Sequence, residues 1–503
     1  MKKIDKIFLV YILILFLSLA FTFQYKSILS DEGTHLLLSV FYKDLFFHGI
    51  ETGFGFENLY DFGINYLVHY PKLQVIYPPL FHFSNAFVFS VFGISELFGK
   101  FVSLLYAILS FSVFYLIISK VFNKKLALVS TILFSLSPIS LLFISGVFQD
   151  FVSIFWLLLS IYSYVFALEK GKTRFFALTG FFVFLSVMGK QMGGFIILFF
   201  ICHMLFLIKT KENKKQNIKN LIVLLLCFSL PLTPYLFALQ KIGGFEINKM
   251  VAIDYAFDQG EPVSIFDVNY WTSYVARSVN DNIFLVFMFP VFLFYILRKN
   301  PYWKYMLSYF LLFYILLSLI PNKEPRFAQF FLLPVYLATA YYLLKDRRIL
   351  VGFIVVYFIF SASIFVQTLN HYPIDEVAEK LFNNIPEGGN IATFTDKDPV
   401  YSSAIMWHLR LLDKERKTAV YRKCIFDGKN STEIEKILQE NNIYFITKVK
   451  EDNEQINLEN ISLFFNITKN NITIEIYKYD GFFYEEKPFC NYICLTKEAI
   501  CSK

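Results

Sequence analysis

Charged residues are scarce in this chain. Only 17% of its 503 residues are Asp, Glu, Lys or Arg, whereas 56% are hydrophobic and 20% are aromatic. Because soluble domains contain about 25% charged residues, the composition excludes a soluble globular protein and indicates an integral membrane protein. The net charge of +7 does not indicate nucleic-acid binding, since the basic residues gather in short loops between apolar runs, as the positive-inside rule expects.

Several motifs are also missing. The chain has no Walker loop and no dinucleotide fingerprint, so nothing indicates a nucleotide substrate. It has no paired C-x-x-C motif, which argues against a structural zinc site. Four of its six cysteines follow residue 371, and in an external domain they would form one or two disulfides whose pairing the sequence leaves open. These four are Cys424, Cys490, Cys494 and Cys501.

Apolar runs long enough to cross a membrane predict eleven transmembrane helices. A crossing takes roughly 20 apolar residues. The predicted spans are residues 7–24, 100–119, 126–146, 151–168, 175–189, 192–208, 219–239, 283–297, 305–321, 327–344 and 348–367. Lysines before the first span, and no cleavage site after it, predict a retained signal anchor with a cytoplasmic N-terminus. Eleven crossings then place the C-terminus outside.

The apolar run 78–97 does not fit this path, because a full crossing there would invert every later span. We expect it to lie in the interface or to re-enter the membrane. With this run included, the fold class is an α-helical polytopic membrane protein of about 11–13 transmembrane helices, with a membrane domain at 1–370.

Residues 371–503 have a different character, because they are charged and rich in Asn. Residues 375–384 and 431–441 have helical patterns, whereas 390–395, 443–449 and 471–479 are typical of strands. All N-x-S/T sequons of the chain lie here, as expected of an external segment; they begin at Asn430, Asn460, Asn466 and Asn471. The tail therefore predicts an extracytoplasmic α/β domain.

Two adjacent carboxylates follow the first span. Asp31 and Glu32 open an external loop, residues 25–77, that ends in Tyr77-Pro78-Pro79. The carboxylates either act on a membrane-borne substrate or cap the helix that follows. The Tyr-Pro-Pro corner either lines a substrate cavity or merely returns the chain to the membrane.

Three more polar patches fall on the external side of the predicted path. Gln149-Asp150 lies between two spans, and Lys190-Gln191 lies at the tip of a tight hairpin. The positive-inside rule disfavours a lysine on the outer face, so we expect this lysine to have an anionic partner or ligand. Lys323 and Arg326 could clamp a phosphate or instead contact lipid headgroups and Glu324.

Acids and cations facing one external cavity suit a lipid-phosphate sugar. The cations would stabilise the anionic leaving group, and a carboxylate would accept the proton of the acceptor hydroxyl. A polyprenyl chain would also explain the need for a large apolar domain.

These motifs resemble those of the GT-C membrane glycosyltransferases, in particular the protein O-mannosyltransferases and the aminoarabinose transferases of lipid A. The resemblance covers roughly residues 1–345 and implies a polyprenyl- or dolichyl-phosphate sugar donor, with inversion at the anomeric carbon. It implies Asp31 as general base, Glu32 as its support and Asp150 as a second acid. Lys190, Lys323 and Arg326 would hold the donor phosphate. Whether Asp31, Glu32 and Asp150 bind a divalent metal ion stays open.

The chain departs from both groups. Ile76-Tyr77 precedes the Pro-Pro pair where the aminoarabinose transferases carry Glu-Lys, and the tail lacks the β-trefoil repeat of eukaryotic protein mannosyltransferases. Glycan, glycolipid and protein acceptors therefore all stay open. The alternative function is a transporter or flippase of lipid-linked sugars, but the chain shows no internal repeat and almost no charge within its spans.

Overall fold

The computed structural model describes residues 3–28, 30–69, 77–210, 213–241, 268–320, 323–369, 372–394, 402–412, 418, 420–421, 425–426, 429–450, 460–469, 472–481, 490–493 and 498–501. The chain divides into two compact units that interleave along the sequence. The helical unit comprises 1–23, 76–81 and 100–368, and the sheet unit comprises 24–75, 82–99 and 369–503. The sheet unit thus takes in much of the first loop, which the sequence assigned to the membrane domain.

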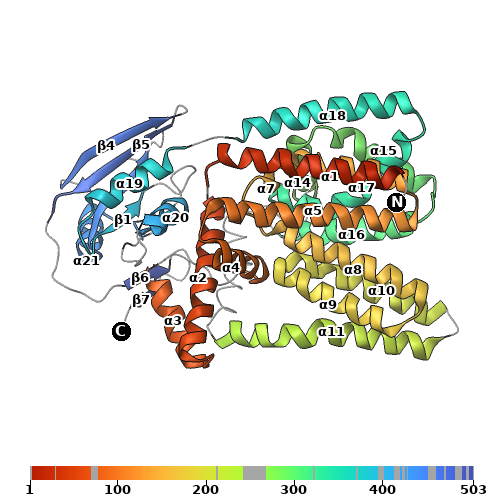
Figure 1. Ribbon diagram of the computed structural model, residues 1–503, viewed down its shortest axis with the longest axis horizontal. Helices are drawn as coiled ribbons and strands as arrows, with labels where there is room; N and C mark the ends of the chain where they lie inside the picture. Colours follow the sequence, from red (N-terminus) through yellow and green to blue (C-terminus); the bar gives the residue numbers. More distant parts are fainter. Residues whose placement is uncertain are drawn as a thin grey trace. The chain divides into compact units, whose positions relative to one another are not determined.

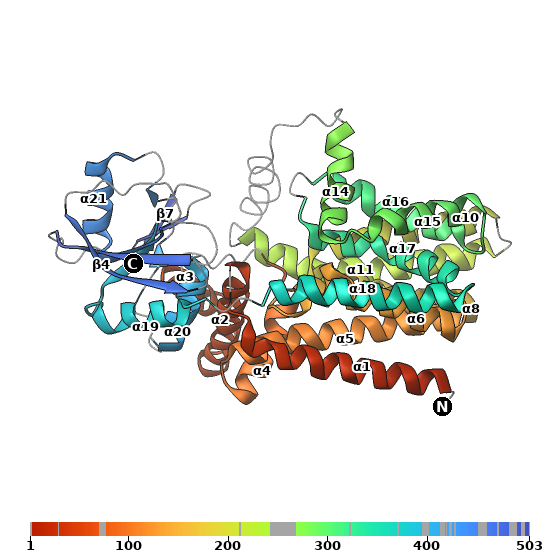
Figure 2. The same cartoon turned by 90° about the horizontal axis from the view of Figure 1, so that it is seen from above.

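The helical unit is built from long apolar helices, and α1, α5 and α18 run in the same general direction in Figures 1 and 2. Its elements are α1 (Lys3–Thr22), α5 (Glu96–Val121), α6 (Lys124–Ser135), α7 (Pro138–Ile144), α8 (Asp150–Lys170), α9 (Thr173–Gly189), η2 (Gln191–Phe195), α10 (Ile196–Thr210), α11 (Lys214–Lys241), α14 (Val268–Asp281), α15 (Leu285–Leu297), α16 (Trp303–Ser318), η4 (Pro325–Phe327), α17 (Ala328–Leu343) and α18 (Arg347–Gln367). A short 3₁₀ turn, η1 (Phe23–Tyr25), follows α1.

A helix lies at each of the eleven predicted spans. In the described part of the chain, six helical segments are long and apolar enough to cross a membrane, and α6 with α7, bent by 64°, would form a seventh. The chain is therefore a multi-pass membrane protein. The helix in the ambiguous run, α4 (Leu80–Phe92), has 13 residues. At 1.5 Å per residue it is about 20 Å long, too short to cross. The total of eleven crossings stays a prediction.

Helix α17 lies in the interior of the helical unit. It carries no charged residue, and all but two of its sixteen residues are buried. It packs against α6, α15 and α16. A helix that is apolar all round is stable only when neighbours cover every face, so α17 is the central helix around which these neighbours assemble.

The sheet unit combines a mixed β-sheet with helices from both ends of the chain. Its elements are α2 (Ser30–Thr52), α3 (Phe56–His69), most of α4, α19 (Ile374–Asn384), β1 (Asn390–Thr393), α20 (Ser402–Leu412), β2 (Val420–Tyr421), α21 (Ser431–Glu440), β3 (Ile443–Val449), β4 (Ile461–Lys469), β5 (Ile472–Tyr479), β6 (Cys490–Ile493) and β7 (Glu498–Cys501). The strand order is β2-β1-β3-β5-β4, with β1 parallel to β2 and β3, and β5 antiparallel to β3 and β4.

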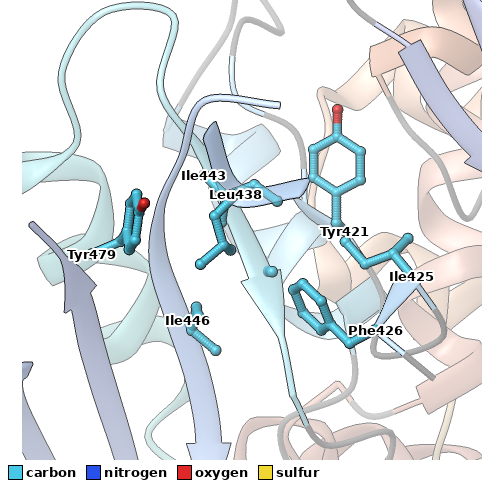
Figure 3. Close-up of a cluster of buried hydrophobic side chains, with 8 residues drawn as sticks. Tyr421, Ile425, Phe426, Leu438, Ile443, Ile446 and Tyr479 are labelled. Carbon is cyan, nitrogen blue, oxygen red and sulfur yellow. The ribbon is translucent and has the colours of Figure 1, made fainter. Parts of the chain in front are cut away.

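A cluster of apolar side chains forms the core beside this sheet, as Figure 3 shows. Tyr421, Leu438, Ile443 and Ile446 are at most 1% exposed within it. Leu438 comes from α21, which begins with a capping box: the Asn430 side chain accepts the Glu433 N–H, and the Glu433 side chain accepts the Asn430 N–H. The cap determines where α21 begins and therefore which of its faces meets the sheet.

The predicted α/β tail is confirmed, and five of its elements lie within two residues of their expected bounds. Helix α20 and strand β4 were missed. Helix α20 is short, with eleven residues. Strands β6 and β7 pair with Cys490 opposite Cys501; the expected disulfides stay a prediction.

Helix α2 depends on a glycine where it packs against α20. A Cβ on Gly33 would lie 2.4 Å from the backbone oxygen of Ser403, whereas one on Gly63 in α3 would meet nothing closer than 3.9 Å. We expect Gly33→Ala to destabilise the sheet unit by about 1–3 kcal/mol through overpacking, visible as a lower thermal unfolding temperature. The control Gly63→Ala should leave that temperature unchanged or raise it; equal behaviour of the two variants would refute the close contact.

Candidate functional site

A buried ion pair joins two of the predicted site residues in the helical unit. Asp150 is the first residue of α8 and is 0% exposed, and Lys190 follows α9 and is 6% exposed. The Lys190 Nζ lies 2.6 Å from the Asp150 Oδ1. The N-terminal end of α8 also favours the carboxylate charge. A charge-assisted hydrogen bond of this length orients both side chains.

Two serines hold the backbone that carries Lys190. The Ser153 Oγ donates to the Ser186 carbonyl at 2.9 Å, and the Ser186 Oγ donates to the Ser153 carbonyl at 2.8 Å. The Lys190 N–H then donates to the Ser186 carbonyl at 2.9 Å. These reciprocal bonds tie α8 to the end of α9 and so bring Asp150 and Lys190 together.

Glycines flank Lys190 because the same contacts leave no room for side chains. A Cβ on Gly189 would lie 2.8 Å from the Ser153 nitrogen. One on Gly193 would lie 2.0 Å from the Ser186 Oγ and 2.2 Å from the Ser153 Oγ. The glycines around the sequence Lys190-Gln191 are therefore a packing requirement of the ion pair.

A third charged group, Arg326 of η4, lies near this pair. Its guanidinium pairs with Glu324 and lies 5.7 Å from the centre of the Phe327 ring. The Lys190 Nζ lies 4.5 Å from the centre of the same ring. Burial lowers the pKa of Lys190, the Asp150 carboxylate opposes this shift, and Arg326 adds to it. The structure thus brings Asp150, Lys190 and Arg326 into one cluster.

Lys323 lies at the end of α16, where the sequence predicted a phosphate ligand. Its Nζ donates to the carbonyls of Ser318 and Ile320 and lies 4.2 Å from the centre of the Tyr270 ring. Burial, with the nearby charge of Arg277, lowers the pKa of Lys323 to about 8. An ammonium has three donors, so one remains beyond the two that cap the helix.

Helix α14 supports this segment, and the sequence analysis missed it. Tyr274 donates to the Glu324 carbonyl at 2.9 Å, and the Arg277 Nη1 donates to the Lys323 carbonyl at 3.5 Å. The signal was present, since Tyr270, Tyr274 and Arg277 follow the i, i+4, i+7 spacing of one helical face. Because α14 is polar, it was not among the predicted membrane spans.

The remaining predicted site residues of the helical unit differ in their burial. Gln149 is 3% exposed, and its Oε1 has no hydrogen-bond partner within the described residues. Pro78 and Pro79 are buried, Tyr77 is partly exposed, and Gln191 is exposed. The Gln149 amide is thus a buried acceptor that a bound hydroxyl could satisfy.

Asp31 and Glu32 lie in the sheet unit, in the first turn of α2. Glu32 is 1% exposed, and its Oε1 lies 3.4 Å from the Nζ of Lys26. Asp31 is partly exposed. A carboxylate pair in the first turn also complements the helix dipole. One turn further along, the His35 Nδ1 lies 3.0 Å from the Nε2 of His82, a buried contact that the sequence analysis missed.

In the portions of the chain that the structure describes, no three His, Cys, Asp or Glu side chains form a group that could hold a metal ion. The metal role of Asp31, Glu32 and Asp150 stays a prediction. The shared cavity predicted for the residues of the two units also stays a prediction.

Residues 77–236 match the family described as dolichyl-phosphate-mannose-protein mannosyltransferase. No curated protein matches the chain. Among solved structures, apo ArnT from Cupriavidus metallidurans matches with a TM-score of 0.60 at 9% identity, over 94% of this chain and 98% of ArnT. ArnT bound to undecaprenyl phosphate matches with a TM-score of 0.59 at 9% identity, over 95% of this chain and 99% of ArnT.

A second solved structure of similar fold is that of an oligosaccharyltransferase. The archaeal oligosaccharyltransferase AglB from Archaeoglobus fulgidus, in complex with an inhibitory peptide and a dolichol-phosphate, matches with a TM-score of 0.51 at 12% identity, over 87% of this chain and 69% of AglB. The chain has the GT-C fold. The resemblance predicted from short motifs is confirmed. In this GT-C chain the family match includes Asp150 and Lys190, whereas Asp31, Lys323 and Arg326 lie outside it.

The Asp150–Lys190 pair can be tested by a double-mutant cycle. Asp150→Asn leaves the buried Lys190 without its counter-charge and should cost about 3 kcal/mol of unfolding free energy. Lys190→Met in the same chain removes the stranded charge and should restore most of that loss. Unfolding of the purified single and double variants measures the coupling; additive losses would show that the two side chains do not interact.

Proposed function

We propose that the protein transfers a sugar from a polyprenyl- or dolichyl-phosphate carrier to an acceptor hydroxyl on the external membrane face, with inversion. The observation that carries the proposal is the cation cluster of Lys190 and Arg326, which is positioned by Asp150 and Phe327. Undecaprenyl phosphate on ArnT and dolichol-phosphate on AglB, two proteins of the same fold, support a lipid phosphate as the ligand of these cations.

In the proposed reaction the acceptor oxygen attacks the anomeric carbon, and the bond from this carbon to the phosphate oxygen breaks. Lys190 and Arg326 stabilise the charge that develops on the leaving phosphate. Asp150 holds Lys190 in place, so its contact with that lysine gives it a positioning role beside the expected role of second acid. The third donor of Lys323 adds a hydrogen bond to the phosphate.

Asp31 is proposed as the base that accepts the proton of the acceptor hydroxyl. Its neighbour Glu32 is buried against Lys26, which suits a support that orients the first turn of α2. Asp31 is partly exposed, so a substrate can reach its side chain. The sugar and the acceptor are the parts of the reaction that the motifs do not specify.

Removing the carboxylate of Asp31 tests this assignment. Asp31→Asn keeps the size of the side chain but cannot accept a proton, so turnover should fall about 10²- to 10⁴-fold. The assay is transfer of radiolabelled sugar from dolichyl-phosphate mannose or glucose to extracted host glycans by purified protein. Asp61→Asn, the same change at an exposed residue of α3, is the control. A small loss in Asp31→Asn with a large one in Asp150→Asn would move the base to Asp150.

The pH profile tests the role of Lys323. Its lowered pKa of about 8 means that its ammonium is charged below that pH and loses its proton as the pH rises. The kcat/KM for the donor, which reports the free enzyme, should therefore fall as pH increases through about 8. Lys323→Arg keeps its charge throughout this range and should remove that fall. An unchanged alkaline limb in Lys323→Arg would assign it to another group.

A further inference from the structure

A cavity of about 570 Å³ lies between α5, α8, α10, α16 and α17 of the helical unit. Most of its lining is aliphatic or aromatic, including Phe114, Leu158, Phe199, Met306 and Leu333. This volume is typical of a site for a small apolar ligand. None of the predicted site residues lines it.

The cavity lies at the opposite end of these helices from the candidate site. Helix α8 begins with Asp150 and lines the cavity with Leu158 to Glu169. Helix α16 lines it with its first half, Tyr305 to Tyr309, whereas Lys323 follows its last residue. From Asp150 to Glu169, α8 rises by about 28 Å, so the end of the cavity at Glu169 and the candidate site lie at opposite ends of this helix.

Polar groups lie at two depths in this apolar lining. Deep inside, the hydroxyl of Tyr309 is buried and has no hydrogen-bond partner in the described parts of the chain. Tyr164 and the His203 Nδ1 form a hydrogen bond of 2.7 Å beside it. At the helix ends, Lys120 Nζ pairs with Glu169 at 2.5 Å.

We propose that this cavity is a binding site for an anionic phospholipid of the leaflet opposite the candidate site. One hydrocarbon chain fills the apolar interior. The anionic headgroup lies among the basic residues at the helix ends, near Lys120.

The charges around the mouth support this headgroup. The chain around the ends of α5, α8 and α15 is rich in lysine and arginine: Lys124, Lys125, Lys170, Lys172, Arg174, Arg298, Lys299 and Lys304. Lys124 pairs with Asp5, and Lys170 pairs with Glu169. Each basic residue near a membrane surface attracts anionic lipid by about 1 kcal/mol. A polyprenyl phosphate also has an anionic head, so competition between the two lipids distinguishes them.

Photo-crosslinking of a phosphatidylglycerol with a diazirine in one acyl chain tests the site in the full-length protein in nanodiscs. Crosslinks should map to the peptides around Met306 and Tyr309. Met306→Trp fills the cavity and should reduce these crosslinks at least fivefold. Leu293→Trp, on an exposed face of α15, is the matched control and should not change them.

Competition identifies the lipid class. Unlabelled phosphatidylglycerol should displace the probe at lower concentration than phosphatidylcholine, and at lower concentration than polyprenyl phosphate. Crosslinks that persist in Met306→Trp would overturn the site. Equal competition by phosphatidylcholine would show that the site does not select an anionic headgroup. Stronger competition by polyprenyl phosphate would show that the cavity binds a polyprenyl carrier and not a phospholipid. None of these readouts depends on sugar transfer, so they stand apart from the proposed activity.

Discussion

The buried pair of Asp150 and Lys190 is the constraint on which the candidate site depends. Neither charge is stable alone in an apolar interior, and each is stabilised only by the other at close range. This requirement explains the reciprocal hydrogen bonds of Ser153 and Ser186, which keep α8 and the end of α9 in contact. It also explains why glycine flanks the lysine, since any side chain at Gly189 or Gly193 would push these backbones apart.

The same cluster shows how an aromatic residue organises cations in a membrane protein. The ring of Phe327 is close to both Lys190 and Arg326, and its negative face offsets part of the repulsion between them. Helix α14 adds hydrogen bonds to the backbone just before η4. Cations held in this way are already oriented before an anionic ligand arrives, which is the arrangement that lowers the cost of binding it.

Much of the architecture was predictable because lipid imposes simple rules on sequence. Every apolar run of sufficient length became a helix, as the satisfaction of backbone groups in a membrane requires. The tail was also predictable, because the capping box at Asn430 and the β-branched residues in Ile443–Val449 are local signals. Helices α14 and α20 were not predicted: α14 is too polar for a membrane span, and α20 has only eleven residues.

The sequence alone determined the chemical types at the candidate site, namely carboxylates and cations at the ends of apolar runs, together with the glycines around Lys190. Only the tertiary structure decided which of them meet, because contacts between residues 40 positions apart, such as Asp150 and Lys190, follow from helix packing and leave no local periodicity. It likewise decided that Glu32 is buried against Lys26 and that Lys323 caps α16. These choices depend on which side chains the packed helices exclude from solvent, a property of the assembled fold.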